Sequence, residues 1–356
     1  MRILQVIPVL DMAGAETMCQ NLSVELHKMG HDVLVISLYT KETPLTANLR
    51  QSGVPVKFLG KKTGLDIRCF YRLYREIRKF QPDVVHSHIY GGKYAHIAAS
   101  AAGVKVKVHT VHSIAQKEAT SNNQKINRAL FNKMGVLPVA LSEEIRQSIA
   151  EVYHLNPIEI PIACNGIPME RCEPCSAYLK TAISFIHVGR FYEEKNHANL
   201  IRGFVKAHEQ YPAIQLRFYG DGPLRREMEN LVAELQAQDF IHFMGLTDDV
   251  YSAMAKADVF ILPSIYEGMP MTLIEAMATG LPIITTPVGG IVDMLEDGKE
   301  AVFTGTDSAS IAESVSMLVD NAALRQSLGQ AARMKAKRFS AKAMAKKYLE
   351  IYSEGT

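Results

Sequence analysis

Short apolar runs rich in valine and isoleucine alternate along the chain with segments of helical periodicity. Strands of a parallel sheet are buried on both faces and helices cover the sheet, so this alternation predicts doubly wound α/β structure. In the first half the predicted strands span residues 2–9, 32–38, 54–59, 83–87, 105–111, 136–142 and 158–164. In the second half they span residues 183–188, 214–219, 240–243, 258–262, 282–286 and 301–304.

The segment between the first two runs indicates what lies between strands. Met18, Leu22, Leu26 and Met29 recur at helical spacing, and Gly30 stands where a left-handed residue commonly ends a helix. The pattern predicts a unit of strand, glycine turn, helix and strand. In such sheets the loops after the carboxyl ends of the strands line the ligand crevice, and helix N-termini there attract anions.

A length of 356 residues favours two domains, because one hydrophobic core rarely grows that large. The alternation breaks near Asn165, and the stretch up to Tyr178 has two prolines and little periodicity, as a linker does. We predict a first domain over residues 1–166 and a second over residues 178–339, with a ligand-binding cleft between them. A last helix over residues 340–356 is expected to pack back on the first domain.

Composition narrows the class of protein. With 47% hydrophobic and 21% charged residues the chain has the composition of a globular protein. A net charge of +2 argues against a protein that coats nucleic acid. Five scattered cysteines fit a reducing, cytoplasmic compartment rather than a disulfide framework. The apolar opening run predicts a strand and not a signal peptide, and no run approaches the roughly 20 apolar residues of a membrane span. We expect a protein that at most touches a membrane from one side.

Two short patterns have the spacing of metal ligands. Cys172 and Cys175 are separated by two residues, but no second cysteine pair accompanies them, so a linker with two thiols is the favoured interpretation. His86 and His88 end a predicted strand without an adjacent carboxylate. We therefore expect no metal and no cofactor.

The loop after the first predicted strand is built from small residues. It runs from Asp11 to Glu16, and Gly14 at its centre would let a phosphate approach the start of the next helix. A plain tight turn accounts for the loop equally well. The dinucleotide fingerprint G-x-G-x-x-G is absent, since residues 220–225 end in arginine where glycine or alanine is required, and this weakens nicotinamide or flavin chemistry.

Two cations follow the first predicted strand of the second half. The Arg190 guanidinium could donate hydrogen bonds to two oxygens of a diphosphate, and the Lys195 ammonium could attract the diphosphate as a point charge. Alternatively both are solvated surface charges, with Lys195 paired to Glu193 or Glu194.

The segment from Pro263 to Ala276 combines a glycine- and proline-containing loop with a helix that begins near Met271. Free amides at that helix start could bind phosphate oxygens. Glu267 lies in the loop and Glu275 about one turn inside the helix, so two hydroxyl-bearing parts of one extended ligand, such as a sugar and a ribose, could donate to them. Each acid could instead be a structural cap or a surface charge.

Together these segments resemble the retaining glycosyltransferases of GT-B fold, family 4. The resemblance covers essentially the whole chain, from the Ala-Gly-Ala-Glu turn to Gly290, and the pair Glu267-x7-Glu275 followed by Ala-Met-Ala-Thr-Gly-Leu-Pro-Ile is its most specific part. It implies two Rossmann-like domains facing a cleft. Ala13, where the family usually has glycine, is a departure that concerns the fit of the donor and not a charged role.

The resemblance also implies roles for individual residues. Arg190 and Lys195 would bind the donor diphosphate, Glu267 would lie against the transferred sugar, and His112 matches the family histidine near that sugar. A structural hydrogen bond is the alternative role of His112. The residues that the resemblance assigns to the donor are Gly14, Leu246, Thr247, Gly268, Met269, Pro270, Met271, Thr272 and Glu275.

The function implied is a metal-independent, retaining hexosyl transfer from a nucleotide-diphosphate sugar, expected to be UDP-linked. The acceptor would be a saccharide or a lipid-linked saccharide in polysaccharide biosynthesis. A nucleotide-sugar epimerase of GT-B fold and a non-catalytic nucleotide-sugar-binding protein are the alternatives.

A basic segment within the first half bears on location. Arg68, Arg72, Arg75, Arg78 and Lys79 alternate with apolar residues, as in a cationic amphipathic helix that rests on an anionic membrane. A peripheral contact with the inner surface of the cytoplasmic membrane and an ordinary surface helix both fit this pattern.

Overall fold

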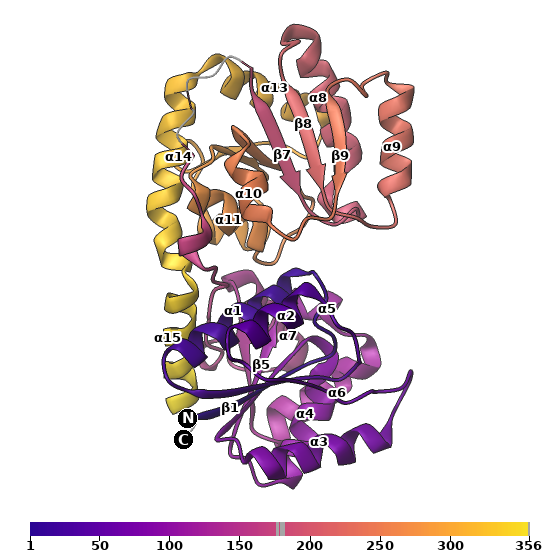
Figure 1. The fold of residues 1–356 in the computed structure, drawn as a ribbon, viewed down its shortest axis with the longest axis vertical. Helices are drawn as coiled ribbons and strands as arrows, with labels where there is room; N and C mark the ends of the chain where they lie inside the picture. The colour runs from indigo at the N-terminus through magenta and orange to yellow at the C-terminus, as the bar shows by residue number, and fades with distance from the viewer. Residues whose placement is uncertain (176–177, 179–181, 355–356) are drawn as a thin grey trace. The chain divides into compact units, whose positions relative to one another are not determined.

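The computed structural model describes residues 1–175, 178 and 182–354. Its contacts divide the chain into two compact units, Met1–Ile167 with Ser340–Thr356, and Pro168–Phe339 (Figure 1). Residues 179–181, at the start of the predicted second domain, and residues 355–356, at the end of the predicted last helix, lie outside the described part.

The first unit contains a parallel sheet in the order β3-β2-β1-β4-β5-β6. Its strands are β1 (Arg2–Ile7), β2 (Asp32–Ser37), β3 (Val56–Phe58), β4 (Val84–His88), β5 (Val106–Val111) and β6 (Val136–Ala140). Its helices are α1 (Gly14–Lys28), α2 (Pro44–Gln51), α3 (Ile67–Phe80), α4 (Gly92–Ala101), α5 (Ala115–Glu118), α6 (Ser121–Lys133), α7 (Glu143–Tyr153) and α15 (Ala341–Glu354). The order reverses between β1 and β4, and this switch point is where such sheets bind ligands.

The second unit repeats the design with the order β12-β11-β10-β7-β8-β9. Its strands are β7 (Ser184–Val188), β8 (Gln215–Tyr219), β9 (Ile241–Gly245), β10 (Val259–Leu262), β11 (Ile283–Thr285) and β12 (Val302–Phe303). Its helices are α8 (His197–Gln210), α9 (Arg225–Glu234), α10 (Val250–Ala255), α11 (Met271–Thr279), α12 (Ile291–Met294), α13 (Ser308–Asp320) and α14 (Ala322–Ala336). Two six-stranded parallel sheets confirm the predicted fold class.

One predicted strand is wrong. The run 158–164 forms a short 3-10 helix over Pro157–Glu159 and then makes only an isolated bridge, between Ala140 and Ile162. Pro161 lies inside the run, and a proline without an N–H cannot continue a sheet ladder.

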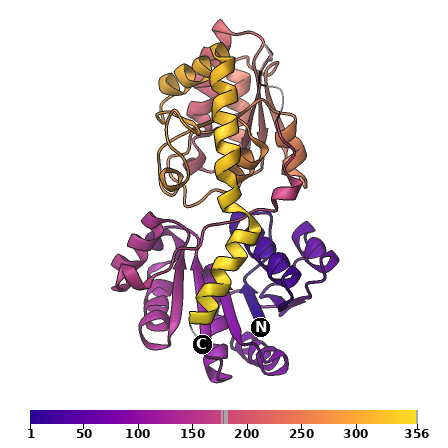
Figure 2. The ribbon, with the colours of Figure 1, turned by 90° about the vertical axis from the view of Figure 1, so that its left-hand side faces the viewer.

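The predicted unit of strand, glycine turn, helix and strand is present. In α1 the side chains of Met18, Leu22 and Leu26 are buried, and the φ of Gly30 is +88°, as a left-handed helix end requires. α15 packs against α1 and buries Tyr348 and Tyr352 within the first unit (Figure 2). The part of the chain that the structure describes contains no helix long and apolar enough to cross a bilayer.

Candidate active site

The loop between β10 and α11 brings a cation and an acid together. The Nζ of Lys195 lies 2.6 Å from Oε1 of Glu267, and Ser264 Oγ donates to the same oxygen at 2.6 Å. The Glu267 carboxylate is almost fully buried. Lys195 lies at the end of a 3-10 turn, Glu193–Lys195, and its Cδ would stand 3.6 Å from a Cβ at residue 189, where the glycine leaves room for its stem. Lys195 therefore contacts the acidic loop and not the neighbouring glutamates.

Arg190, two residues after β7, is exposed, and its guanidinium lies over the ring of Tyr192 at 5.0 Å. The stacked arrangement leaves the N–H groups at the rim of the guanidinium open to an anion.

The N-terminus of α11 is uncapped by any side chain, so its first backbone amides have no intrahelical acceptor. Met271 and Thr272 are its first residues, and the helix dipole adds partial positive charge there. The preceding residues Gly268, Met269 and Pro270 form the end of the loop, with Met269 and Pro270 buried. This arrangement can bind an anion close to the Lys195–Glu267 pair.

Glu275, inside α11, is buried, and burial raises the pKa of its carboxyl to about 7. The positive charge of Arg171 and a hydrogen bond from the Tyr251 hydroxyl both act to lower that pKa, but they offset only part of the effect. A ligand that donates further hydrogen bonds to the Glu275 carboxyl would favour its ionised form. Tyr251 and Arg171 were missed by the sequence reasoning, because only the fold brings α10 and the segment before residue 175 against α11.

Leu246 and Thr247 follow β9. Leu246 is largely exposed, and the Thr247 hydroxyl accepts a hydrogen bond from the amide of Asp249 at 3.2 Å. Both residues lie in the second unit with the Lys195–Glu267 pair, after the carboxyl end of an edge strand.

In the first unit, Gly14 is the exposed first residue of α1, which no side chain caps. His112 follows β5, and its Nε2 lies 3.1 Å from Nδ1 of His88. The Glu118 carboxylate accepts hydrogen bonds from the amides of His112 and Ser113 and so fixes the turn. Burial lowers the pKa of His112 to about 4, so the imidazole is neutral at physiological pH.

The side chains at the two spacings typical of metal ligands are hydrogen-bonded or buried within the protein. His86 is hydrogen-bonded to Tyr352 and Thr110, and His88 to Gln5 and His112. Cys172 is buried, and burial raises the pKa of its thiol to about 12, which keeps it protonated. Among the described residues no group of three or more His, Cys, Asp or Glu side chains could hold a metal ion.

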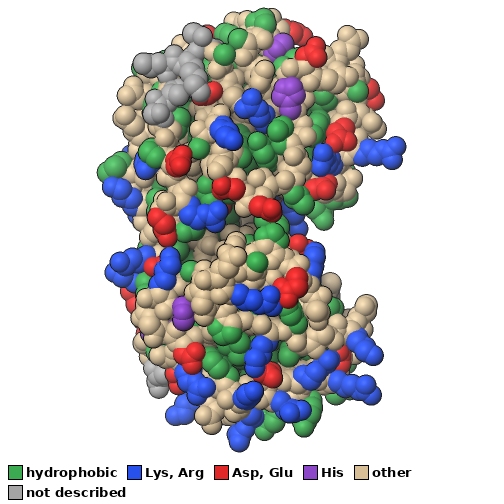
Figure 3. All heavy atoms as spheres, in the orientation of Figure 1, with side chains coloured by type: hydrophobic (Ala, Val, Ile, Leu, Met, Phe, Trp, Pro, Cys, Tyr) green, Lys and Arg blue, Asp and Glu red, His purple; other side chains and the backbone are tan. Residues whose placement is uncertain are grey.

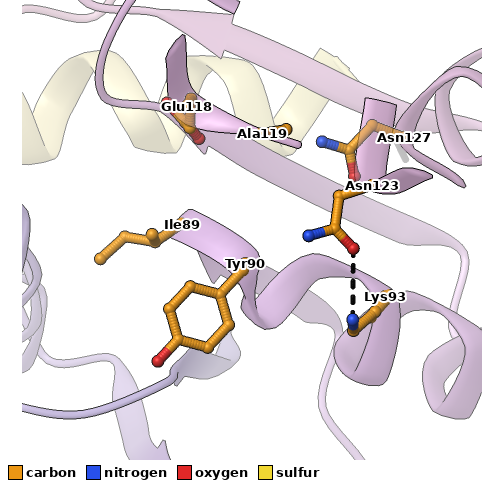
Figure 4. A pocket seen from close by; sticks show the side chains of 7 residues that line it. All are labelled: Ile89, Tyr90, Lys93, Glu118, Ala119, Asn123 and Asn127. Atoms are coloured by element: carbon orange, nitrogen blue, oxygen red, sulfur yellow. Dashed lines mark hydrogen bonds between the residues drawn. The ribbon is translucent and has the colours of Figure 1, made fainter. Parts of the chain in front are cut away.

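A small pocket lies beside this histidine turn (Figure 4). Its empty volume of about 280 Å³ includes open solvent, and little of it is enclosed. It is lined by Ile89, Tyr90, Lys93, Glu118, Ala119, Asn123 and Asn127. Lys93 donates to the amide oxygen of Asn123 at 3.2 Å, and the wall is rich in groups that hydrogen-bond hydroxyls. No spacing in the sequence indicates this pocket, because it forms where residues 89–93 meet residues 118–127.

Comparison with known proteins identifies the family and the fold of the chain. The family model described as Glycosyltransferase Family 4 matches residues 12–171, and that described as Glycosyl transferases group 1 matches residues 178–335. The chain is 26% identical over 289 residues to the Escherichia coli UDP-Gal:alpha-D-GlcNAc-diphosphoundecaprenol alpha-1,3-galactosyltransferase, covering 75% of each chain. It is also 26% identical over 350 residues to EpsF of Bacillus subtilis, itself classed as a glycosyltransferase, covering 92% of this chain and 88% of EpsF.

The fold is similar to that of HepE from Anabaena, crystallised in complex with UDP. The TM-score is 0.86 at 17% sequence identity, with 99% of this chain and 100% of that chain covered. HepE has also been crystallised with UDP-glucose. The resemblance inferred from the sequence is confirmed: this chain belongs to the group 1 glycosyltransferases, family 4, a retaining family, and has the GT-B fold.

Proposed function

We propose that this protein transfers a hexose from a UDP-linked sugar to a saccharide or lipid-linked saccharide, with retention and without a metal ion. The observation that carries the proposal is the Lys195–Glu267 pair beside the uncapped start of α11. Support for UDP comes from HepE, crystallised with UDP and UDP-glucose, and from the UDP-Gal in the name of the E. coli relative. That name also supports a diphosphate-lipid-linked acceptor.

The second unit would stabilise the leaving diphosphate electrostatically. The Lys195 ammonium, the exposed Arg190 guanidinium and the amides of Met271 and Thr272 supply positive charge without a cation cofactor. Glu267 uses Oε1 to hold Lys195 and Ser264, so its second oxygen can accept a hydrogen bond from a hydroxyl of the transferred sugar.

The remaining donor-binding residues follow from their positions. Glu275, with its raised pKa, would accept from the ribose hydroxyls, and backbone near Leu246 and Thr247 would hold the base. In the first unit Gly14 is assigned to the phosphates and His112 to the sugar. The bond to the phosphate breaks early, an oxocarbenium-like state forms, and a phosphate oxygen takes the proton of the acceptor hydroxyl entering on the same face.

The small pocket beside the His112 turn is our candidate contact for one polar group of the acceptor. Its amides and the Lys93 ammonium suit a hydroxyl-rich saccharide with an anionic group. It shares Glu118 with the turn that carries His112, and this supports the proposal that acceptor and donor sugar bind at adjoining residues.

A lipid-linked acceptor requires access to a membrane, and α3 offers a surface for it. Leu65, Ile67 and Tyr71 are 72%, 74% and 63% exposed, and the exposed cations Arg68 and Arg75 lie among them on the same turns. Lysine and arginine side chains are frequent over the part of the first unit where α3 lies (Figure 3). Apolar anchors amid basic residues fit the cytoplasmic face of an anionic bilayer.

The proposal is tested by screening UDP-sugars for thermal stabilisation, then supplying the stabilising sugar with polyprenyl-diphosphate-linked N-acetylglucosamine. Transfer is expected in the presence of EDTA, and Lys195→Met and Arg190→Met should each lower kcat/KM at least tenfold. Lys206→Met, which alters an exposed lysine of α8 outside the site, is the matched control. Conversion of the donor without acceptor would instead identify an epimerase, and binding without turnover a non-catalytic protein.

A further inference from the structure

A line of buried polar groups runs through the first unit from α15 to His112. The Tyr352 hydroxyl lies 3.5 Å from Nε2 of Gln5, whose Oε1 lies 2.9 Å from Nε2 of His88. The Nδ1 of His88 in turn lies 3.1 Å from Nε2 of His112. Gln5, His88 and Tyr352 are fully buried. Water therefore does not compete for their hydrogen bonds, and each group donates to or accepts from its neighbour in the line.

The chemistry of each group fixes the direction of the line. A carboxamide oxygen can only accept, so the Nε2 of His88 must carry the proton that Gln5 Oε1 receives. Burial holds the pKa of His88 well below its ordinary value, so the ring is neutral and has one N–H. Its Nδ1 is then a bare acceptor, and the N–H in the contact with His112 belongs to His112 Nε2.

His112 is neutral as well. Burial depresses its pKa more than the nearby Glu118 carboxylate raises it, and the neighbouring imidazole of His109 acts in the same direction as burial. With its single proton on Nε2, His112 has a bare Nδ1. That atom has no hydrogen-bond partner among the residues that the structure describes, and it is not enclosed.

We propose that His88, oriented by Gln5, is a positioning residue that holds His112 in the Nε2–H tautomer. The Nδ1 of His112 is thereby the atom offered to a ligand, and it accepts a hydrogen bond from a sugar hydroxyl. The inference rests on the proposed function, in which that ligand is the donor sugar. It assigns His112 an accepting role and predicts that a donor lacking the recognised hydroxyl is used poorly.

The C-terminal helix takes part in this control. The Tyr352 hydroxyl receives the Gln5 amide N–H and lies 2.7 Å from Nδ1 of His86, whose Nε2 lies 2.8 Å from the Thr110 hydroxyl. If the Gln5 carboxamide were reversed, its NH₂ would face His88, and both histidine tautomers would reverse with it. Tyr352 therefore orients the amide on which the tautomer of His112 depends.

The proposal is tested by ¹⁵N NMR of histidine side chains in the full chain at neutral pH, with His112→Gln identifying the His112 signals. A protonated Nε2 and a bare Nδ1 are expected, and a protonated Nδ1 overturns the proposal. Because this measurement requires no turnover, its failure is distinct from a failure to find transfer, which would refute the proposed function instead.

Two phenylalanine variants test the line itself. Tyr352→Phe removes the acceptor for the Gln5 amide and should add the second tautomer to the His112 spectrum and lower kcat about tenfold, the equivalent of one net hydrogen bond. Tyr348→Phe removes another buried α15 hydroxyl, 2.7 Å from Thr110 Oγ1 beyond His86, and should change neither. Equal spectra and equal kcat for both variants would refute the role assigned to Tyr352 and Gln5.

Discussion

The two carboxylates of the α11 region should respond to neutralisation in opposite directions. Among the described residues, the Tyr251 hydroxyl and the charge of Arg171 act to stabilise the buried Glu275 carboxylate, whereas Glu267 is bonded to Lys195 and Ser264. Replacing Glu275 by glutamine removes an unfavourable buried charge. Replacing Glu267 by glutamine leaves the Lys195 ammonium without its counter-charge, which is destabilising in a partly buried pair.

The size of the Glu275 effect follows from its pKa. The folded protein raises the pKa from 4.5 to about 7, so the contribution to stability is fully present below pH 4.5 and is lost as pH rises to 7. At 1.36 kcal/mol per pH unit, about 3 kcal/mol is lost across this window. The free energy of unfolding of Glu275→Gln, measured against that of the wild type, should therefore rise from about 1 kcal/mol at pH 5 to about 3 kcal/mol at pH 8.

Urea unfolding at pH 5, 6, 7 and 8 measures this difference, because groups that titrate alike in both proteins cancel. Glu267→Gln should lower the free energy of unfolding by about 1–3 kcal/mol at pH 7 to 8. This is less than the roughly 3–5 kcal/mol for a broken, fully buried pair, because the Lys195 side chain is 17% exposed. A pH-independent difference for Glu275→Gln, or equal signs for the two variants at pH 8, would refute the reasoning.

Three further predictions concern the rest of the chain. Ile67→Glu should abolish flotation of the protein with vesicles of phosphatidylglycerol. Ile158→Glu, which changes a side chain that is 86% exposed but lies outside the basic surface, should leave flotation unchanged. Equal flotation of the two variants would contradict the proposed membrane-binding surface. Gly203→Ala places a Cβ 2.7 Å from the carbonyl of Ser308 and should lower the free energy of unfolding by about 1–3 kcal/mol in urea. Gly166→Ala places a Cβ 2.7 Å from the backbone at the start of α15 and should have a similar effect, with proteolysis of the C-terminus as the readout; resistance equal to the wild type would contradict it.

The sequence was sufficient for the sheets because parallel strands are apolar on both faces, and every strand overlaps a predicted run. The strand predicted over residues 158–164 was wrong, because that prediction relied on apolar composition and did not account for Pro161. The sequence could name Glu267 and Lys195 but not their pairing. The two residues are 72 positions apart in the sequence and are brought together because β7 and β10 lie side by side. Glu193 and Glu194, the alternative partners, are nearer to Lys195 in the sequence, but Lys195 pairs with Glu267 in the structure.

The histidines show a different limit. His86, His88 and His112 could be placed at strand ends by periodicity, but their partners Gln5 and Tyr352 come from opposite ends of the chain. The sequence predicted that the last helix packs back on the first domain. Nothing in the sequence indicates that a buried tyrosine hydroxyl of that helix would complete a hydrogen-bonded line.

If the donor binds at Glu275 as proposed, its binding should be coupled to the release of a proton. Keeping an acid with a pKa of about 7 in the core is unfavourable at neutral pH, and ribose hydroxyls that donate to it would stabilise its ionised form. Binding should therefore lower its pKa, so that UDP-sugar binds more tightly as pH rises from 6 to 8 and releases up to one proton near pH 6.5. Calorimetry in two buffers of different ionisation enthalpy measures that release, which Glu275→Gln should abolish. The diphosphate of a UDP-sugar does not titrate in this range, so a binding enthalpy independent of the buffer would mean that the ligand does not reach Glu275.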